Sequence, residues 1–353
     1  MYLPIPTLAS LWAACKENGS PTRCLLAVDI GGTKIGYALF PIQGNALHDI
    51  PLFSSELPTP KGKEALLAAL WELVRLSLEE SVKKNLLVFP VISIGSPGRF
   101  IGPEGTIIAK GSAENMSLVK GEFDGVNLSQ EIKRGLPEDF TIIVNNDAVA
   151  QMAAGVNALL QDPVLKQQLA GQKVGYIGPG TGLGGGFGQL DNEGHLEVYS
   201  DGHIYDILIP FYGQSKRAED VFSGRACLER TGLNAKNINH SEYLFQKYLW
   251  AVEEFGHALP LLIEKIYRGQ FEKLDPEAQW PAEDMDRVRG TALYLIGGGM
   301  GTSSPMGSII IQTAQHDLKE KGLDFIRLIP IPQAPLAALV GAAQFGVPFI
   351  QSQ

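Results

Sequence analysis

The stretch LLAVDIGGTKIGYALF, residues 25–40, decides the fold. An apolar run ends at Asp29, a turn formed by Gly31, Gly32, Thr33 and Lys34 follows, and a second apolar run closes the stretch. This order predicts a strand, a tight turn and another strand. Because glycine lacks a Cβ, the turn backbone can approach a ligand and donate its N–H groups to an anion.

The side chains at this turn add chemistry to the backbone. Asp29 stands at a strand end, where it could hold a hydrated Mg²⁺. Thr33 contributes a hydroxyl and Lys34 a cation. The stretch is therefore a candidate phosphate and metal cradle. A Gly-rich hairpin with a solvated lysine would have the same sequence, so partner loops elsewhere must decide between the two interpretations.

Composition limits the class of protein. The 353 residues are 45% hydrophobic and 19% charged, which is typical of a soluble chain with about two domains. The net charge of −9, without a basic tract, argues against a nucleic-acid partner. Three cysteines without CxxC spacing argue against a disulfide framework and favour a cytoplasmic setting.

Neither end of the sequence predicts a membrane or export signal. The N-terminus lacks the basic segment of a signal peptide. Residues 328–353 carry no charge, but prolines interrupt them, and the uninterrupted part is too short to span a bilayer. We expect this part to form a buried Ala- and Gly-rich helix.

Polar or Gly-rich loops follow four more predicted buried strands. They are the loop at Gly95, Ser96, Pro97 and Gly98; the Asn146-Asp147 pair; the second hairpin within 174–190, with Gly180, Thr181, Gly182 and Gly184; and the run Gly297, Gly298 and Gly299. Ends of strands are where α/β folds bind ligands. Asp147 also precedes a small-residue helix, so it could cap that helix, act in catalysis, or do both.

The remaining periodicity predicts helices alternating with strands, which calls for an α/β sheet with crossovers. The expected helices cover 8–16, 63–84, 128–134, 241–254, 257–267, part of 302–321, and 335–345, and a helical region is expected to begin within 218–230. The second strand–turn–strand unit repeats the first, which predicts a duplicated architecture.

Taken together, these motifs resemble those of the ROK family of sugar kinases and the bacterial glucokinases. DIGGTKIG is similar to the first phosphate motif, GSPGRF to the loop beside the sugar, VNNDAVAQMAAG to the catalytic segment, GPGTGLGGGF to the second phosphate motif, LIGGGM to the adenosine motif and PLAALVGAAQFG to the C-terminal helix. The resemblance covers about residues 25–349.

The resemblance implies two duplicated ribonuclease H-like α/β domains of the actin and hexokinase type, with a central cleft. Residues 1–24 would be an N-terminal extension, 25–147 with 335–353 a small domain, and 148–334 a larger one. Family members are often homodimers, so a homodimer is expected.

The resemblance also implies roles for individual residues. Asp147 would be the catalytic base, and Asp29 would hold Mg²⁺, directly or through water. The sugar would contact Ser96, Pro97, Gly98, Asn115, Asn146, Asp147, Asp201, His203 and Glu219. ATP would contact the first hairpin from Asp29 to Lys34, the second from Gly180 to Gly184, and Gly297, Gly298 and Gly299.

One segment departs from the family pattern. Family members carry Glu-x-Gly-His after the second phosphate motif, whereas this chain has Ser200, Asp201, Gly202 and His203. They also commonly hold a structural zinc with that histidine and a Cys-rich loop. No cysteine lies between His203 and Glu219, so we expect no zinc site.

The sequence therefore predicts an ATP- and Mg-dependent hexose kinase acting on the 6-hydroxyl of glucose or a close relative. Two alternatives stay open: a kinase for an N-acyl amino sugar, which the change at Ser200 would suit, and a non-catalytic sugar-binding regulator with the same fold. The phosphoryl donor could also be polyphosphate or ADP.

Overall fold

The structure is a computed structural model of the chain, and it describes residues 5, 7–16, 20–44, 46–101, 107–200, 203–270, 272–273, 282–331 and 336–351. The chain divides into two compact units, Met1–Ala154 with Leu336–Gln353, and Gly155–Pro335. Unit 1 and unit 2 denote these two parts.

Unit 1 is built on one sheet in the order β3-β2-β1-β5-β8, with β4 paired to β2. Its strands are β1 (Thr22–Ile30), β2 (Lys34–Gln43), β3 (Ala46–Leu47), β4 (Phe53–Pro58), β5 (Leu86–Ser96) and β8 (Thr141–Asn146), with a ribbon of β6 (Phe100–Ile101) and β7 (Ile107–Ile108). Its helices are α1 (Leu8–Lys16), α2 (Lys63–Lys83), α3 (Leu128–Lys133), the first part of α4 (Asp147–Leu160), and α14 (Ala337–Gln351).

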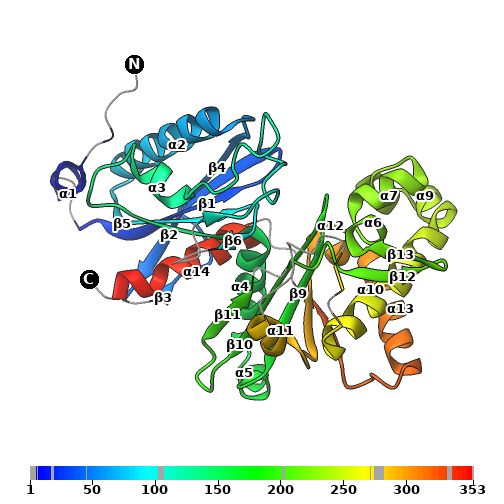
Figure 1. Ribbon diagram of the computed structural model, residues 1–353. Coiled ribbons are helices and arrows are strands. Elements are labelled where there is room, and N and C mark those ends of the chain that lie inside the picture. Colours follow the sequence, from blue (N-terminus) through cyan, green and yellow to red (C-terminus); the bar gives the residue numbers. More distant parts are fainter. Residues whose placement is uncertain are drawn as a thin grey trace. The chain divides into compact units, whose positions relative to one another are not determined.

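Alternation along β1 sets the two faces of this sheet. Leu26 and Val28 join the core formed with α2 and α3. Leu25 and Ala27 join a second core with α4 and α14. Figure 1 shows α2 and α14 on opposite faces of the sheet. Because side chains alternate along a strand, Asp29 follows Leu25 and Ala27 and points toward the face that α4 covers.

Unit 2 is built on a sheet in the order β11-β10-β9-β14-β15. Its strands are β9 (Lys173–Pro179), β10 (Leu183–Leu190), β11 (Leu196–Ser200), β14 (Leu293–Ile296) and β15 (Arg327–Pro330), with a ribbon of β12 (Leu208–Phe211) and β13 (Gln214–Arg217). Its helices are α5 (Pro163–Leu169), α6 (Ala218–Val221), α7 (Gly224–Thr231), α8 (Ala235–Asn239), α9 (Glu242–Lys247), α10 (Leu249–Arg268), α11 (Ala282–Val288), α12 (Gly298–Thr302) and α13 (Met306–Glu320).

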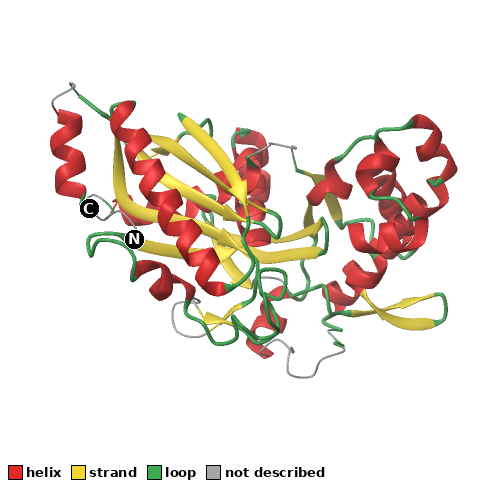
Figure 2. Cartoon of the chain, turned by 90° about the horizontal axis from the view of Figure 1, so that it is seen from above, coloured by secondary structure: helices red, strands yellow, loops and turns green. Residues whose placement is uncertain are grey.

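The two sheets repeat one pattern of strand pairing. In unit 1, β4, β2 and β1 pair antiparallel, and β5 and β8 then continue the sheet in parallel. In unit 2, β11, β10 and β9 pair antiparallel, and β14 and β15 continue in parallel. Helices accompany the strands in each unit (Figure 2). This repetition is what a duplicated α/β architecture requires.

The predicted elements agree with the structure except in the helical part of unit 2 and at the last helix, which continues past its expected end at 345 to Gln351. The break expected between 254 and 257 is wrong, because the chain changes helix at Tyr248 and α10 runs unbroken from Leu249 to Arg268. Gly256 lies inside α10 where a Cβ would come within 2.5 Å of Thr313, so this glycine allows α10 to pack against α13. The helical region expected to begin within 218–230 starts with two helices, α6 and α7, because Ser223 caps α7 by accepting the N–H of Ala226 at 3.1 Å.

Cys15, Cys24 and Cys227 are free and buried. Burial raises the pKa of the Cys24 thiol. Within the described residues, no helix combines the length and apolar character needed to cross a membrane.

Candidate functional site

Asp29 and Asp147 lie on either side of Gly95. The parallel strands β1, β5 and β8 are adjacent, and Asp29 pairs in register with Gly95. A Cβ on Gly95 would lie 3.6 Å from Oδ1 of Asp29 and 3.8 Å from Cα of Asp147. The two predicted functional acids are thus neighbours at the carboxyl ends of the strands.

Both carboxyl groups are half-buried, and burial controls their proton affinity. The pKa of Asp29 is raised to about 7, mainly by burial and then by the Asp147 charge, while Lys34 opposes the rise. Burial also raises the pKa of Asp147, against the effect of the Ala148 N–H. Two like charges in a partly desolvated site favour binding of a proton or a cation. Oxygen ligands of this kind fit Mg²⁺.

The Asn146 side chain fixes the entry to α4. Its Oδ1 accepts the N–H groups of Ala148 at 2.9 Å and Val149 at 3.2 Å, so Asn146 acts as the helix cap. Its Nδ2 donates to the carbonyl of Gly98 at 2.8 Å and holds the predicted sugar loop. Gly98 has a φ of 117°, which favours glycine there. Asp147 also accepts the Ala148 N–H at 2.9 Å, but Asn146 accepts two N–H groups of the first turn and is the main cap.

Residues from the loop after β4 hold the first hairpin. Thr59 donates through Oγ1 to the carbonyl of Gly31 at 2.7 Å, and Lys61 Nζ donates to the carbonyl of Gly32 at 2.9 Å. Asn115 lies beside Gly32: a Cβ on Gly32 would be 3.7 Å from Nδ2 of Asn115. Lys34 instead pairs with Glu56 at 2.5 Å. The hairpin motif gave no indication of Lys61, because it lies far along the chain in an ordinary Pro- and Gly-containing loop.

The second hairpin packs against the predicted adenosine motif in unit 2. Gly298 has a φ of 66°, and a Cβ there would lie 2.5 Å from the carbonyl oxygen of Pro179. Gly297 caps α12 and donates its N–H to Ile177 at 2.9 Å. At Gly180 and Gly299, a Cβ would meet no atom within 4 Å. The two motifs are therefore in contact, and the backbone is open at Gly180 and Gly299.

The two turns leave backbone donors available. In each turn, protein donors bind carbonyl oxygens: Thr59 binds those of Gly31 and Thr33, and Arg225 binds that of Thr181. In the part of the chain that the structure describes, no acceptor receives the turn N–H groups at Gly32, Thr33, Thr181 and Gly182. Accessible N–H groups of this kind form anion-binding turns.

Glu219, the predicted sugar-binding acid, contacts the second hairpin. Its Oε2 accepts the N–H of Leu183 at 3.3 Å, and its Oε1 accepts Nη2 of Arg225 at 2.9 Å. Gly182 allows this approach, since a Cβ there would lie 3.0 Å from Oε2. Arg225 was not among the predicted site residues, because its contacts with Glu219 and the hairpin depend on the tertiary fold.

His203 is buried, with both ring nitrogens engaged. Its Nε2 is hydrogen-bonded to the hydroxyl of Tyr205, and its Nδ1 lies 3.4 Å from Nζ of Lys273, which is only 5% exposed. Because Lys273 lies at Nδ1 and the Tyr205 hydroxyl at Nε2, neither ring nitrogen is open to a metal ion. These residues do not fit the zinc that the fold family commonly holds. A sugar hydroxyl would have to displace Tyr205 to bind Nε2.

The other predicted residues have less informative surroundings. Ser96 is fully buried at the end of β5. Ser200 ends β11 opposite Phe187. Gly184 lies within β10. Asp201 lies outside the described residues.

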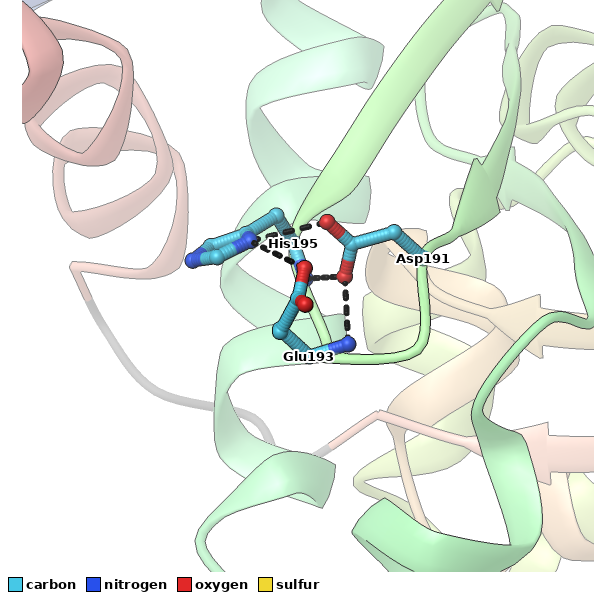
Figure 3. A group of neighbouring side chains, drawn as sticks. All are labelled: Asp191, Glu193 and His195. Atoms are coloured by element: carbon cyan, nitrogen blue, oxygen red, sulfur yellow. Dashed lines mark hydrogen bonds and ion pairs between the residues drawn. The ribbon is translucent and has the colours of Figure 1, made fainter.

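An exposed cluster of Asp191, Glu193 and His195 occupies the turn between β10 and β11 (Figure 3). Oδ1 of Asp191 accepts the N–H groups of Glu193 at 2.9 Å and His195 at 2.8 Å, and its Oδ2 lies 2.8 Å from Nδ1 of His195. The backbone N–H of His195 is the main cause that lowers the pKa of Asp191 to about 2. These internal contacts explain the cluster without a ligand.

Comparison with known proteins identifies the fold. No protein-family model matches the sequence, and no curated protein matches it. A ROK hexokinase from Thermus thermophilus matches with a TM-score of 0.59 at 18% identity, over 94% of this chain and 100% of the other. A ROK glucokinase from Streptomyces griseus, solved with glucose and AMPPNP, matches with 0.59 at 16% identity, over 92% and 99%.

A ROK transcriptional regulator, described as a homologue of the Escherichia coli MLC protein, also matches. Its TM-score is 0.61 at 15% identity, over 92% of this chain and 78% of the regulator. The chain thus has the fold of the ROK sugar kinases, which confirms the predicted duplicated α/β class. Kinases and a regulator share this fold, so activity has to be argued from the site.

Proposed function

We propose that the chain is an ATP- and Mg-dependent sugar kinase that transfers the γ-phosphoryl group to a hexose hydroxyl, with the glucose 6-hydroxyl as the leading candidate. The half-buried pair of Asp29 and Asp147 carries this proposal. Two adjacent acids with raised pKa values are costly to keep charged, which makes them more typical of a site than of a scaffold. The structural neighbour solved with glucose and AMPPNP supports this choice of substrates.

Asp147 is the proposed general base. A raised pKa makes its carboxylate a stronger base while leaving it ionised above that pKa. It would accept the proton of the sugar hydroxyl as that oxygen attacks the γ-phosphorus and ADP leaves. Its first-turn position on α4 keeps the carboxylate close to backbone that Asn146 has fixed. The proton acceptor therefore starts from a constrained position.

The backbone of the two hairpins would bind the phosphates. Accessible N–H groups in both turns can donate to phosphate oxygens, and Lys61 adds a cation to the first turn. Mg²⁺ bound at Asp29 would neutralise phosphate charge during transfer. The open backbone at Gly299 offers a surface for the adenosine moiety.

Asn146 and Glu219 would hold the sugar. Each is already fixed by backbone donors or acceptors: Asn146 by α4 and Gly98, and Glu219 by the second hairpin. The fixed Asn146 amide can bind a sugar hydroxyl with little loss of side-chain entropy, and the Glu219 carboxylate supplies acceptors for neighbouring hydroxyls. His203 would contribute only after Tyr205 moved.

A coupled assay of ADP release tests the function. The full chain is incubated with Mg·ATP and each of about a dozen hexoses and amino sugars, including glucose and N-acetylmannosamine. Turnover on a hexose supports the proposal, and turnover only on an N-acetylated sugar would reassign the substrate class. Parallel reactions with polyphosphate and with ADP identify the donor.

A sugar-binding regulator is the second candidate, because the ROK transcriptional regulator matches the fold and Ser200 replaces an acid of the family pattern. Calorimetry with the same sugars separates the candidates. Sugar binding without turnover for any donor favours the regulator, whereas turnover excludes it as the sole function.

A further inference from the structure

The start of α7 is joined to the turn of the second hairpin. The N–H of Gly224 donates to the carbonyl of Gly180 at 2.7 Å, and the N–H of Arg225 donates to that of Thr181 at 3.1 Å. A Cβ on Gly224 would lie 2.5 Å from the Gly180 oxygen, so glycine is required for this contact. The Arg225 side chain thus leaves the backbone beside the predicted phosphate turn.

The guanidinium of Arg225 contacts three acids, and two of them, Glu219 and Asp220, also accept bonds from other donors. Its Nη2 donates to Glu219 at 2.9 Å and to Asp220 at 3.1 Å, and its Nε lies 3.9 Å from Glu229. Asp220 also receives two bonds from Arg217, at 2.8 and 2.9 Å. The Arg225 side chain is 46% exposed, so a ligand can reach it.

The donors that bind the Glu219 carboxylate would also suit a larger anion. It is bound by the N–H of Leu183, next to the turn, and by Arg225. Backbone N–H groups and the planar arginine fork are the donors that commonly bind phosphate oxygens. Arg217 and Arg225 balance the charges of Glu219 and Asp220, and Glu229 adds one further negative charge 3.9 Å from Nε of Arg225. A phosphate would therefore have to compete with these carboxylates for Arg225.

We propose that Arg225 is a phosphate-binding residue that exchanges partners when nucleotide binds. Without nucleotide it holds Glu219 on the second hairpin. A nucleotide phosphate takes the place of Glu219 on Arg225, and the released carboxylate binds sugar hydroxyls. This inference rests on the proposed kinase function and adds a consequence: nucleotide and sugar each raise the affinity of the other.

The first test measures nucleotide binding by calorimetry on the full chain with Mg·AMPPNP, and with adenosine as a probe that lacks phosphates. Arg225→Gln should weaken AMPPNP by about 10- to 100-fold, the scale of a lost charge-assisted hydrogen bond, and leave adenosine unchanged. Arg225→Lys keeps the charge without the planar fork, so its AMPPNP affinity should lie between those of the unmodified chain and Arg225→Gln.

Arg268→Gln is the matched control. Arg268 lies in the same unit, is 48% exposed and is paired with Glu264 at 3.0 Å, away from the hairpin. This variant should bind both probes as the unmodified chain does. Melting curves for all variants show whether each is folded.

The second test removes the competing charge. Glu219→Gln should tighten AMPPNP binding in the absence of sugar and weaken binding of the sugar that supports turnover. It should also abolish most of the mutual effect of sugar and nucleotide. If Arg225 only supports Glu219, then Arg225→Gln should change the affinity for sugar but not the affinity for AMPPNP.

The outcomes separate this inference from the kinase function. If Arg225→Gln binds AMPPNP as tightly as the unmodified chain, or loses AMPPNP and adenosine equally, the exchange is wrong while turnover still supports the kinase. The same holds if Glu219→Gln leaves AMPPNP binding unchanged. If the unmodified chain binds no AMPPNP and phosphorylates no sugar, both proposals fail.

Discussion

Replacing Asp29 with asparagine should stabilise the metal-free protein while impairing its proposed activity. In the folded chain the pKa of Asp29 is about 7, against an ordinary value of 3.8, mainly because of burial and then because of the Asp147 charge. A folded-state pKa above the unfolded value means that ionisation disfavours the fold. Stability is therefore lost as pH rises between the two values.

The size of the effect follows from this difference. At 1.36 kcal/mol for each pKa unit, a difference of about 3 corresponds to about 4 kcal/mol near neutral pH. Part of this gain is offset because the asparagine amide must also be desolvated. We expect Asp29→Asn to raise the free energy of unfolding by about 2 kcal/mol at pH 7, and by almost nothing at pH 4, where the acid is mostly protonated in the folded chain.

Urea denaturation in metal-free buffer between about pH 4 and pH 8 measures this difference. Asp191→Asn is a control of opposite sign, because the pKa of Asp191 is lowered to about 2 and its charge stabilises the fold. That variant should lose stability at neutral pH. An Asp29→Asn protein that is no more stable than the unmodified chain at pH 7, or whose gain does not grow with pH, would refute the proposed cost of this charge.

Three further predictions concern catalysis and packing. Asp147→Asn should retain sugar and AMPPNP binding but lower turnover by about two or more orders of magnitude, as measured by ADP release. Because burial raises the pKa of Asp147, turnover of the unmodified chain should fall as pH drops through a value above the ordinary 3.8, which a pH–rate profile would show. Gly341→Ala should cost about 3 kcal/mol in urea denaturation, because its Cβ would lie 1.6 Å from the Ala150 carbonyl oxygen.

A specific result would contradict each of these predictions. Near-normal turnover in Asp147→Asn would remove that residue from the mechanism, and a flat pH–rate profile would remove the proposed titration. Gly180→Ala is the packing control, because a Cβ there meets no atom within 4 Å and should cost little stability. Equal losses at Gly341 and Gly180 would show that the close contact with α4 is not the cause.

Local signals in the sequence were enough to predict the elements that organise the fold. Both hairpins, the strand ends at Asp29 and Asp147, and the helix on 63–83 follow from apolar periodicity and glycine spacing. These signals act over a few residues, so the sequence alone exposes them. The helix break expected near residue 255 failed because packing of α10 against α13 overrides the local pattern.

Only the tertiary structure determined which residues support the predicted site and how the pKa of Asp29 is shifted. Lys61 reaches Gly32, Arg225 reaches Glu219 on the second hairpin, and Lys273 reaches His203 from segments that no local motif connects. The raised pKa of Asp29 likewise requires burial and Asp147 as a neighbour. The spacing of residues in the first hairpin predicts a phosphate turn. Its charge and its supports depend on contacts between distant segments, which exist only once the chain has folded.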